Sequence, residues 1–174
     1  MRRSAVLLSI ALIALSSAAV AVAATGTTTL TGTSEWSGLT FEHQESTTVI
    51  HGTFTGRLGK GTYEGTLNGG PWLAGCGPVC ADVTGSITFS SNRGTFTGIV
   101  QPGSLLEALF GSGQDVRSFM LTLSVVDGTR AYSHADGKLL TLTYDSVFSH
   151  YFDPTLNQFV NEINDSGTLT GTLH

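Results

Sequence analysis

A five-residue phrase that recurs along the chain limits its fold more than any other feature. Each copy reads glycine, threonine, a bulky residue, any residue and glycine. The copies occupy residues 52–56, 61–65, 94–98 and 167–171, with Phe54, Tyr63, Phe96 and Leu169 as the bulky residues. Side chains alternate between the two faces of a strand, so each phrase puts its bulky residue and both glycines on one face. Bulk beside glycine is typical of the tapering interior of a small closed β-barrel.

The rest of the chain also reads as strands. Turn signals recur about every ten residues, and the segments between them alternate, which is typical of an all-β barrel or sandwich. We predict strands over residues 27–34, 39–45, 47–56, 61–67, 83–90, 94–100, 118–126, 139–152 and 159–173. The same word, Thr-Leu-Thr-Gly-Thr, stands at 29–33 and at 168–172. We therefore expect the first and last strands to pair, which closes the sheet into an antiparallel barrel of about eight strands.

Two segments break the strand pattern. Residues 68–79 are rich in glycine and proline and are predicted to form a loop. Residues 104–110 are predicted to form one short helix, because Ser104 and Glu107 have capping-box spacing and Gly111 follows as a stop signal. Its large apolar residues predict that this helix plugs one end of the barrel or packs under a loop.

The first 24 residues predict a secretory signal peptide. Two arginines precede an apolar run, and small residues ending Ala23-Ala24 follow it as a cleavage motif. Residues 25–174 are then one β-barrel domain of a secreted protein, and the leader suits a bacterial exporter. Loss of Arg2 and Arg3 would take the net charge from −5 to −7. The sparse basic residues give no stripe for nucleic acid, and no membrane partner is expected after cleavage.

Three residues separate the two cysteines. In an exported protein, Cys76 and Cys80 are expected to form a disulfide that closes a tight loop. A redox-active pair usually has two residues between its cysteines, and zinc would need two further ligands, so these roles are the alternatives.

No catalytic or cofactor motif stands out. The five histidines show no metal-ligand spacing, so no metal is expected, and no serine lies in a GxSxG elbow. No glycine-rich phosphate loop precedes a helix, and no cofactor is expected. Acidic residues within predicted strands remain, because a carboxylate inside a barrel would be desolvated and suited to acid–base work. Glu42 and Asp145 are the two that could point inward, although a solvated face is the simpler interpretation.

One face of the long segment 139–152 is aromatic. It carries Tyr144, Phe148, His150 and Phe152, and Phe159 follows past the Asp153-Pro154 turn. These residues could fill the core, line a site for an apolar ligand, or form a contact between subunits of a homo-oligomer. They are the ligand-binding candidates of this sequence.

Residues 128–139 carry a phrase seen in a known superfamily of barrels. They resemble the turn of allene oxide cyclase and dirigent-like barrels, in which GTGRFxGAxGxL joins two strands. Gly128, Thr129, Ala135, Gly137 and Leu139 match, Tyr132 stands for the aromatic residue, and Arg130 and His134 replace glycines. The resemblance implies an eight-stranded antiparallel barrel whose mouth or cavity holds an apolar substrate, and it carries over no functional residue.

We expect the barrel to bind a small apolar or aromatic molecule in its mouth. The first alternative is a cyclase or isomerase of the allene oxide cyclase type, with Glu42 or Asp145 as its polar group. The second is a non-catalytic cell-surface protein that acts through its loops or its assembly. An open interior would favour the first two functions, whereas a solid interior would count against the cyclase and direct attention to the mouth, the loops and partners.

Overall fold

The computed structural model describes residues 26–37, 45–75, 79–111, 114–155 and 158–173. For residues 150–153 and 159–161 it describes the backbone alone. The predicted signal peptide and the predicted strand over 39–44 lie outside the described residues, so both stay predictions.

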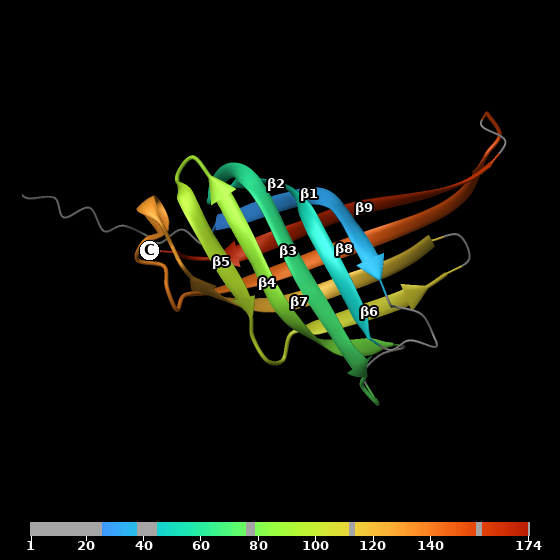
Figure 1. The fold of residues 1–174 in the computed structure, drawn as a ribbon, viewed down its shortest axis with the longest axis horizontal. Helices are drawn as coiled ribbons and strands as arrows, with labels where there is room; N and C mark the ends of the chain where they lie inside the picture. Colours follow the sequence, from blue (N-terminus) through green and yellow to red (C-terminus); the bar gives the residue numbers. More distant parts are fainter. Residues whose placement is uncertain (1–25, 38–44, 76–78, 112–113, 156–157, 174) are drawn as a thin grey trace, which may run out of the picture.

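The fold is a closed antiparallel β-barrel, as predicted (Figure 1). Its strands are β1 (Gly26–Ser37), β2 (Ser46–Gly56), β3 (Gly59–Trp72), β4 (Cys80–Ser91), β5 (Gly94–Val100), β6 (Leu105–Phe110), β7 (Gln114–Val126), β8 (Leu139–Asp153) and β9 (Gln158–Gly171). β5 and β6 both lie between β4 and β7, one after the other, so the nine strands fill eight positions. β1 pairs with β9, as predicted, and the two identical five-residue segments share one rung of the ladder, Thr29 opposite Thr168.

The predicted helix over residues 104–110 is wrong, because this segment forms β6. Leu106 and Ala108 are buried, whereas Leu109 is half exposed, so the segment alternates with a period of two. The outward leucines hid this alternation in the sequence. The Ser104 hydroxyl caps no helix: it accepts a hydrogen bond from the Thr122 amide at 3.0 Å and donates to the Gln101 carbonyl at 2.7 Å. It thereby bridges the break between β5 and β6.

The glycine phrase has the predicted parity. Phe54, Tyr63, Phe96 and Leu169 are at most 2% exposed and fill the interior. Glycines on neighbouring strands leave room for them: a Cβ on Gly32 would overlap the Tyr63 hydroxyl, and one on Gly52 would lie 2.7 Å from it. Tyr63 can therefore extend across the barrel to β8, which is four positions away in the ring of eight.

Aromatic rings form a continuous column through the interior. Successive ring centroids are 4.9 to 6.4 Å apart. From one end of the barrel to the other, the column consists of Tyr132, Phe96, Phe89, Tyr63, Tyr144, Phe119, Trp36 and Phe148. The interior between the two ends is thus a packed core.

The two ends of the barrel differ. The segment between β7 and β8 contains a 3-10 turn, η1 (Arg130–Tyr132), and closes one end, where Tyr132 and Ala135 are buried. The Tyr132 hydroxyl donates to the Leu58 carbonyl, and its ring packs edge-on against Phe96. We call this the closed end. At the opposite end β8 and β9 continue pairing beyond their partners β7 and β1, so their hairpin stands out from the barrel (Figure 1).

The cysteine loop is only partly described. Cys80 is buried at the start of β4, whereas Cys76 lies outside the described residues, so the Cys76–Cys80 disulfide stays a prediction. β3 runs to Trp72, which makes the predicted loop over 68–79 shorter than expected. No helix in the described part of the chain is long and apolar enough to cross a bilayer.

Gly32→Ala tests the space that Tyr63 occupies. Because the new methyl group would overlap the His51 carbonyl and the Tyr63 hydroxyl, we expect unfolding free energy to fall by about 2–3 kcal/mol. The control is Gly70→Ala on the outer face of β3, where the nearest atom is 3.6 Å away; we expect its effect to stay within about 0.5 kcal/mol. Chemical denaturation measures both, and equal losses would contradict this explanation.

Arg130→Gly tests the strain in the closing turn. Arg130 has a φ of 51°, the left-handed region that favours glycine, at the position where the resembled family has glycine. Glycine relieves the backbone strain, but it loses more conformational entropy on folding than arginine does. The net effect should be a rise of about 0.5–1 kcal/mol in the free energy of unfolding. Arg130→Ala removes the same side chain but keeps the strain, so a similar gain in its melting curve would refute this interpretation.

Candidate functional site

The end of the barrel opposite η1 is lined by rings that are only half-buried. Trp36 of β1, Phe110 of β6 and Phe148 of β8 have partly exposed side chains and lie on the inward faces of their strands. Together with Arg117, Ser46 and Thr48 they form what we call the mouth. In the described part of the chain, this is where aromatic side chains of the interior come nearest to solvent.

Arg117 lies at the centre of the mouth. It is 8% exposed, and its guanidinium carbon is 4.4 Å from the ring centroid of Trp36 and 4.2 Å from that of Phe148. The two rings meet edge-on, with centroids 5.6 Å apart. Arginine stacked on aromatic faces gains cation–π attraction and leaves its N–H edge free to donate hydrogen bonds.

The environment of Arg117 is electrostatically unusual. Burial lowers the pKa of its guanidinium, and the negative charge of Asp115, two residues along β7, partly raises it again. The Asp115 carboxylate is held by the Gly111 amide, which donates to it at 3.1 Å. The Nε–H of Arg117 has no hydrogen-bond partner among the described residues.

Two buried hydroxyls at the mouth also lack partners. Ser46 and Thr48 point inward from β2, and they are 5% and 1% exposed. Neither hydroxyl has a hydrogen-bond partner in the described part of the structure. Thr48 lies opposite Trp36 in the ladder of β1 and β2, so it belongs to the same corner of the barrel as Arg117. Unpartnered buried polar atoms are rare in folded proteins and call for a bound group or water.

A polar chain lies beneath the mouth and ends on Asp165 of β9. The Tyr144 hydroxyl donates to one carboxylate oxygen at 2.7 Å, and the Ser34 hydroxyl donates to the other at 3.2 Å. Each hydroxyl has only one proton, so Tyr63 must donate to Tyr144 (3.1 Å) and Ser146 to Ser34 (3.1 Å). Trp36 adds an N–H to Ser34 at 2.8 Å. All of these protons therefore point toward Asp165.

The tyrosines of this chain serve as donors rather than bases. Burial raises the pKa of Tyr144 far above its ordinary range, and its hydrogen bonds and the charge of Asp165 raise it further. Burial also raises the pKa of Tyr63, and the negative charge of Asp165 acts in the same direction. Because the phenols stay protonated, they act as hydrogen-bond donors in the polar chain that ends on Asp165.

The sequence-predicted residues divide between core, mouth and undescribed parts. Tyr144 lies in the core at 0% exposure, and Phe148 lies at the mouth. Asp145 lies on the opposite face of β8 from the buried Tyr144 and Ser146, so it does not point into the barrel. Glu42 lies outside the described residues, as do the side chains of His150, Phe152 and Phe159.

Sequence reasoning missed the two charged residues of the interior. Asp165 precedes Gly167 and Leu169 at the same parity, so the glycine phrase already placed it inside. Arg117 shares its parity with Phe119 and Leu121, but the predicted strand began one residue later. Asp165 already lay within the predicted strand over 159–173 and needed only the parity argument, whereas Arg117 needed the strand over 118–126 to begin one residue earlier.

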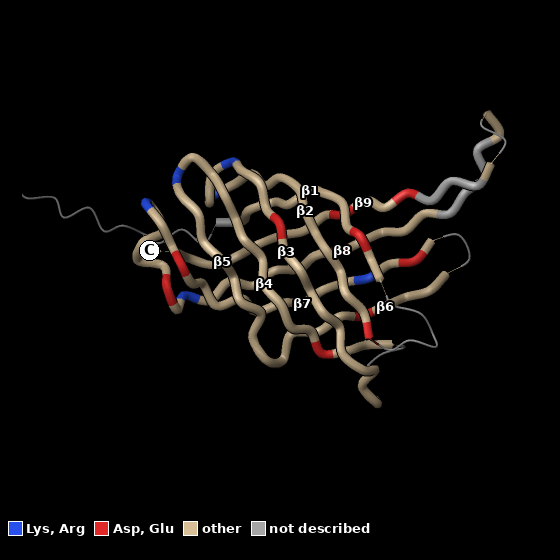
Figure 2. Tube along the Cα trace, viewed as in Figure 1, with Lys and Arg blue, Asp and Glu red and all other residues tan. Residues whose placement is uncertain are grey.

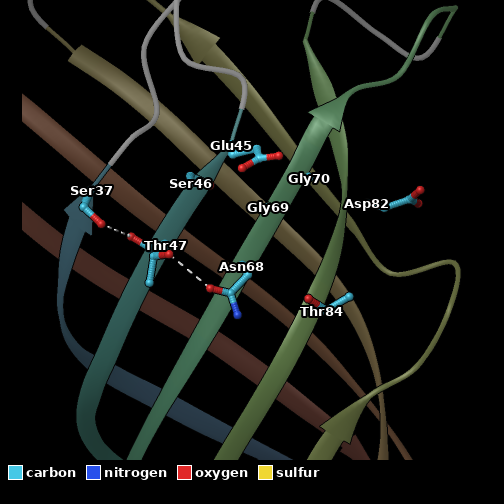
Figure 3. Close-up of a pocket in the computed structure, with 9 residues that line it drawn as sticks. All are labelled: Ser37, Glu45, Ser46, Thr47, Asn68, Gly69, Gly70, Asp82 and Thr84. Carbon is cyan, nitrogen blue, oxygen red and sulfur yellow. Dashed lines mark hydrogen bonds between the residues drawn. The ribbon is translucent and has the colours of Figure 1, made fainter.

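A polar groove lies on the outer face of the barrel, near the same end (Figure 3). It encloses about 520 Å³ and is lined mainly by polar residues of β2, β3 and β4. Ser37 donates to the Thr47 carbonyl at 3.3 Å, and Thr47 donates to Asn68 at 3.1 Å. Glu45 and Asp82 lie apart from one another across the groove (Figure 3). In the described part of the chain, no group of three His, Cys, Asp or Glu residues could hold a metal.

Comparison with known proteins adds no relative. The chain matches no protein-family model, no curated protein and no solved structure. The architecture that the turn at 128–139 implied, an eight-stranded antiparallel barrel, is the one observed. The fold and the mouth thus define the class: a closed antiparallel barrel with a buried aromatic cluster.

Tyr144→Phe tests the polar hydrogen-bond chain that ends on Asp165. It removes the strongest donor to Asp165, so we expect a loss of about 2–3 kcal/mol in unfolding free energy. Tyr132→Phe at the closed end is the matched control, because its hydroxyl donates to an uncharged carbonyl, and about 1 kcal/mol is expected. Urea denaturation compares the two variants. A Tyr144→Phe loss no larger than the Tyr132→Phe loss would show that Asp165 does not depend on this donor.

Proposed function

We propose that the protein binds a small apolar or aromatic molecule at the mouth of its barrel. The observation that carries this proposal is the set of half-buried rings around Arg117, at one end of an otherwise filled barrel. Small-molecule sites combine apolar and aromatic walls with a few polar groups that fix orientation. The mouth has both kinds of group, and three of its polar atoms still lack partners within the described structure.

The filled core agrees with the second alternative, a non-catalytic protein that acts through its loops or its assembly, and it limits where a ligand could lie. Phe54, Phe89, Phe96 and Tyr63 occupy the middle of the barrel with at most 2% exposure, and Tyr132 fills the closed end. A ligand would therefore rest on Trp36 and Phe148 rather than enter the barrel. This favours a shallow site that reaches no deeper than the chain ending on Asp165.

The cyclase or isomerase alternative has less support. It needs an accessible carboxylate or phenol, whereas Asp165 is 5% exposed and both of its oxygens accept hydrogen bonds. Tyr144 is fully buried and its proton is already donated. These groups stabilise the fold and reach no substrate at the mouth.

Binding can be measured directly at the mouth. The chain has two tryptophans, so Trp72→Phe leaves Trp36 as the single tryptophan reporter. We expect 2-acetonaphthone to quench Trp36 saturably and, at about 100 times its Kd, to raise the melting temperature by roughly 5 °C or more.

Phe148→Ala removes one wall of the site and should weaken quenching at least several-fold. Leu139→Ala is the control, because Leu139 lies on β8 at the closed end and is 60% exposed. A Trp36 signal and a melting temperature that stay constant across the probe's solubility range would overturn the proposed function.

A further inference from the structure

We infer that the ligand of the mouth is a neutral aromatic compound that presents a carbonyl-type hydrogen-bond acceptor to Arg117. This inference rests on the proposed function and adds the chemical class of the ligand. It comes from the unpartnered polar atoms of the mouth and from the charges around them.

Arg117 calls for an acceptor at its Nε–H. Trp36 and Phe148 both lie against its guanidinium, with ring centroids 4.4 and 4.2 Å from the guanidinium carbon and 5.6 Å from each other. Its Nε–H is buried and has no partner among the described residues. A guanidinium has donors only, so the complementary group must be an acceptor that approaches its edge.

Ser46 and Thr48 also favour a ligand that carries a hydrogen-bond acceptor. Their hydroxyls are buried and unpartnered within the described structure, and each can donate one proton. Thr48 lies opposite Trp36, the ring that stacks on Arg117. A carbonyl oxygen has two lone pairs, so it can accept from a guanidinium and a hydroxyl together. The remaining unpartnered atom in the described part, on Arg57, belongs to the turn at the closed end.

The charges around the mouth favour a neutral ligand over an anion. Asp115 already faces Arg117 from two residues away on β7 and partly offsets its charge. Figure 2 shows the basic residues gathered mainly at the closed end, with acidic residues along the strands toward the mouth. Among the described residues, Arg117 alone is basic at the mouth, whereas the acidic residues at this end are Glu35, Glu45, Asp82, Glu107, Asp115, Asp145, Glu162 and Asp165. The carboxylate of an anionic ligand beside Arg117 would be repelled by Asp115. Dissolved salt screens this repulsion little at such short range.

Three probes of similar shape separate these requirements. We would titrate Trp72→Phe protein with 2-acetonaphthone, 2-ethylnaphthalene and 2-naphthoate, and follow Trp36 fluorescence. We expect 2-acetonaphthone to bind tightest, roughly 10- to 100-fold more tightly than 2-ethylnaphthalene, because hydrogen bonds to charged groups are strong. We expect 2-naphthoate to bind more weakly than 2-acetonaphthone, and Asp115→Asn to strengthen its binding several-fold without changing that of 2-ethylnaphthalene.

Variants at the two ends of the barrel complete the test. Arg117→Met should reduce 2-acetonaphthone to the affinity of 2-ethylnaphthalene, whereas Arg93→Met, at the closed end, should preserve the preference. If Arg117→Met does not fold, the three probes on the parent protein still decide the question. Equal binding of 2-acetonaphthone and 2-ethylnaphthalene, or tightest binding of 2-naphthoate, overturns this inference and leaves the proposed function standing. Binding of none of the three probes overturns both.

Discussion

Tyr63 crosses the barrel through space that Gly32 and Gly52 leave open, and the rest of the interior depends on this contact. Its hydroxyl reaches Tyr144 on β8, which in turn donates to Asp165. One ring thereby joins two opposite walls of the sheet and supplies the outer donor of a buried carboxylate. A side chain at either glycine would move this ring, and the column of rings on both sides of it would have to move as well.

This contact also separates the barrel into two parts with different chemistry. On the η1 side, Phe89, Phe96 and Tyr132 continue the column as an apolar core closed by a turn. On the other side the inward positions become polar, and half-buried rings reach the rim. Burial of a charge is costly unless donors or acceptors satisfy it, so the polar residues gather where the chain ending on Asp165 and the solvent can both reach them.

The alternation of side chains between the two faces of each strand predicted most of the fold that could be inferred from the sequence. The glycine phrase placed Phe54, Tyr63, Phe96 and Leu169 inside, and the repeated Thr-Leu-Thr-Gly-Thr word paired the first and last strands. The helix assigned to residues 104–110 failed because outward leucines there made a half-buried strand look like an apolar helix. The mouth could not be predicted, since stacking of Arg117 on Trp36 and Phe148 joins β7, β1 and β8. Only the closed sheet brings those strands together, and no local spacing encodes it.

Among the described residues, two charged side chains are buried in the barrel, and they are stabilised in opposite ways. This difference separates structure from function. Asp165 has two direct donors and three more behind them, so its hydrogen-bonding capacity is engaged within the chain itself. Arg117 is stabilised by aromatic rings, which attract its charge, and its Nε–H has no partner among the described residues. A buried charge with donors on both of its oxygens fixes a fold, whereas one with an unpartnered N–H beside half-exposed rings retains binding capacity. The binding chemistry of the mouth therefore depends on how the Arg117 guanidinium is stabilised rather than on how many charged residues surround it.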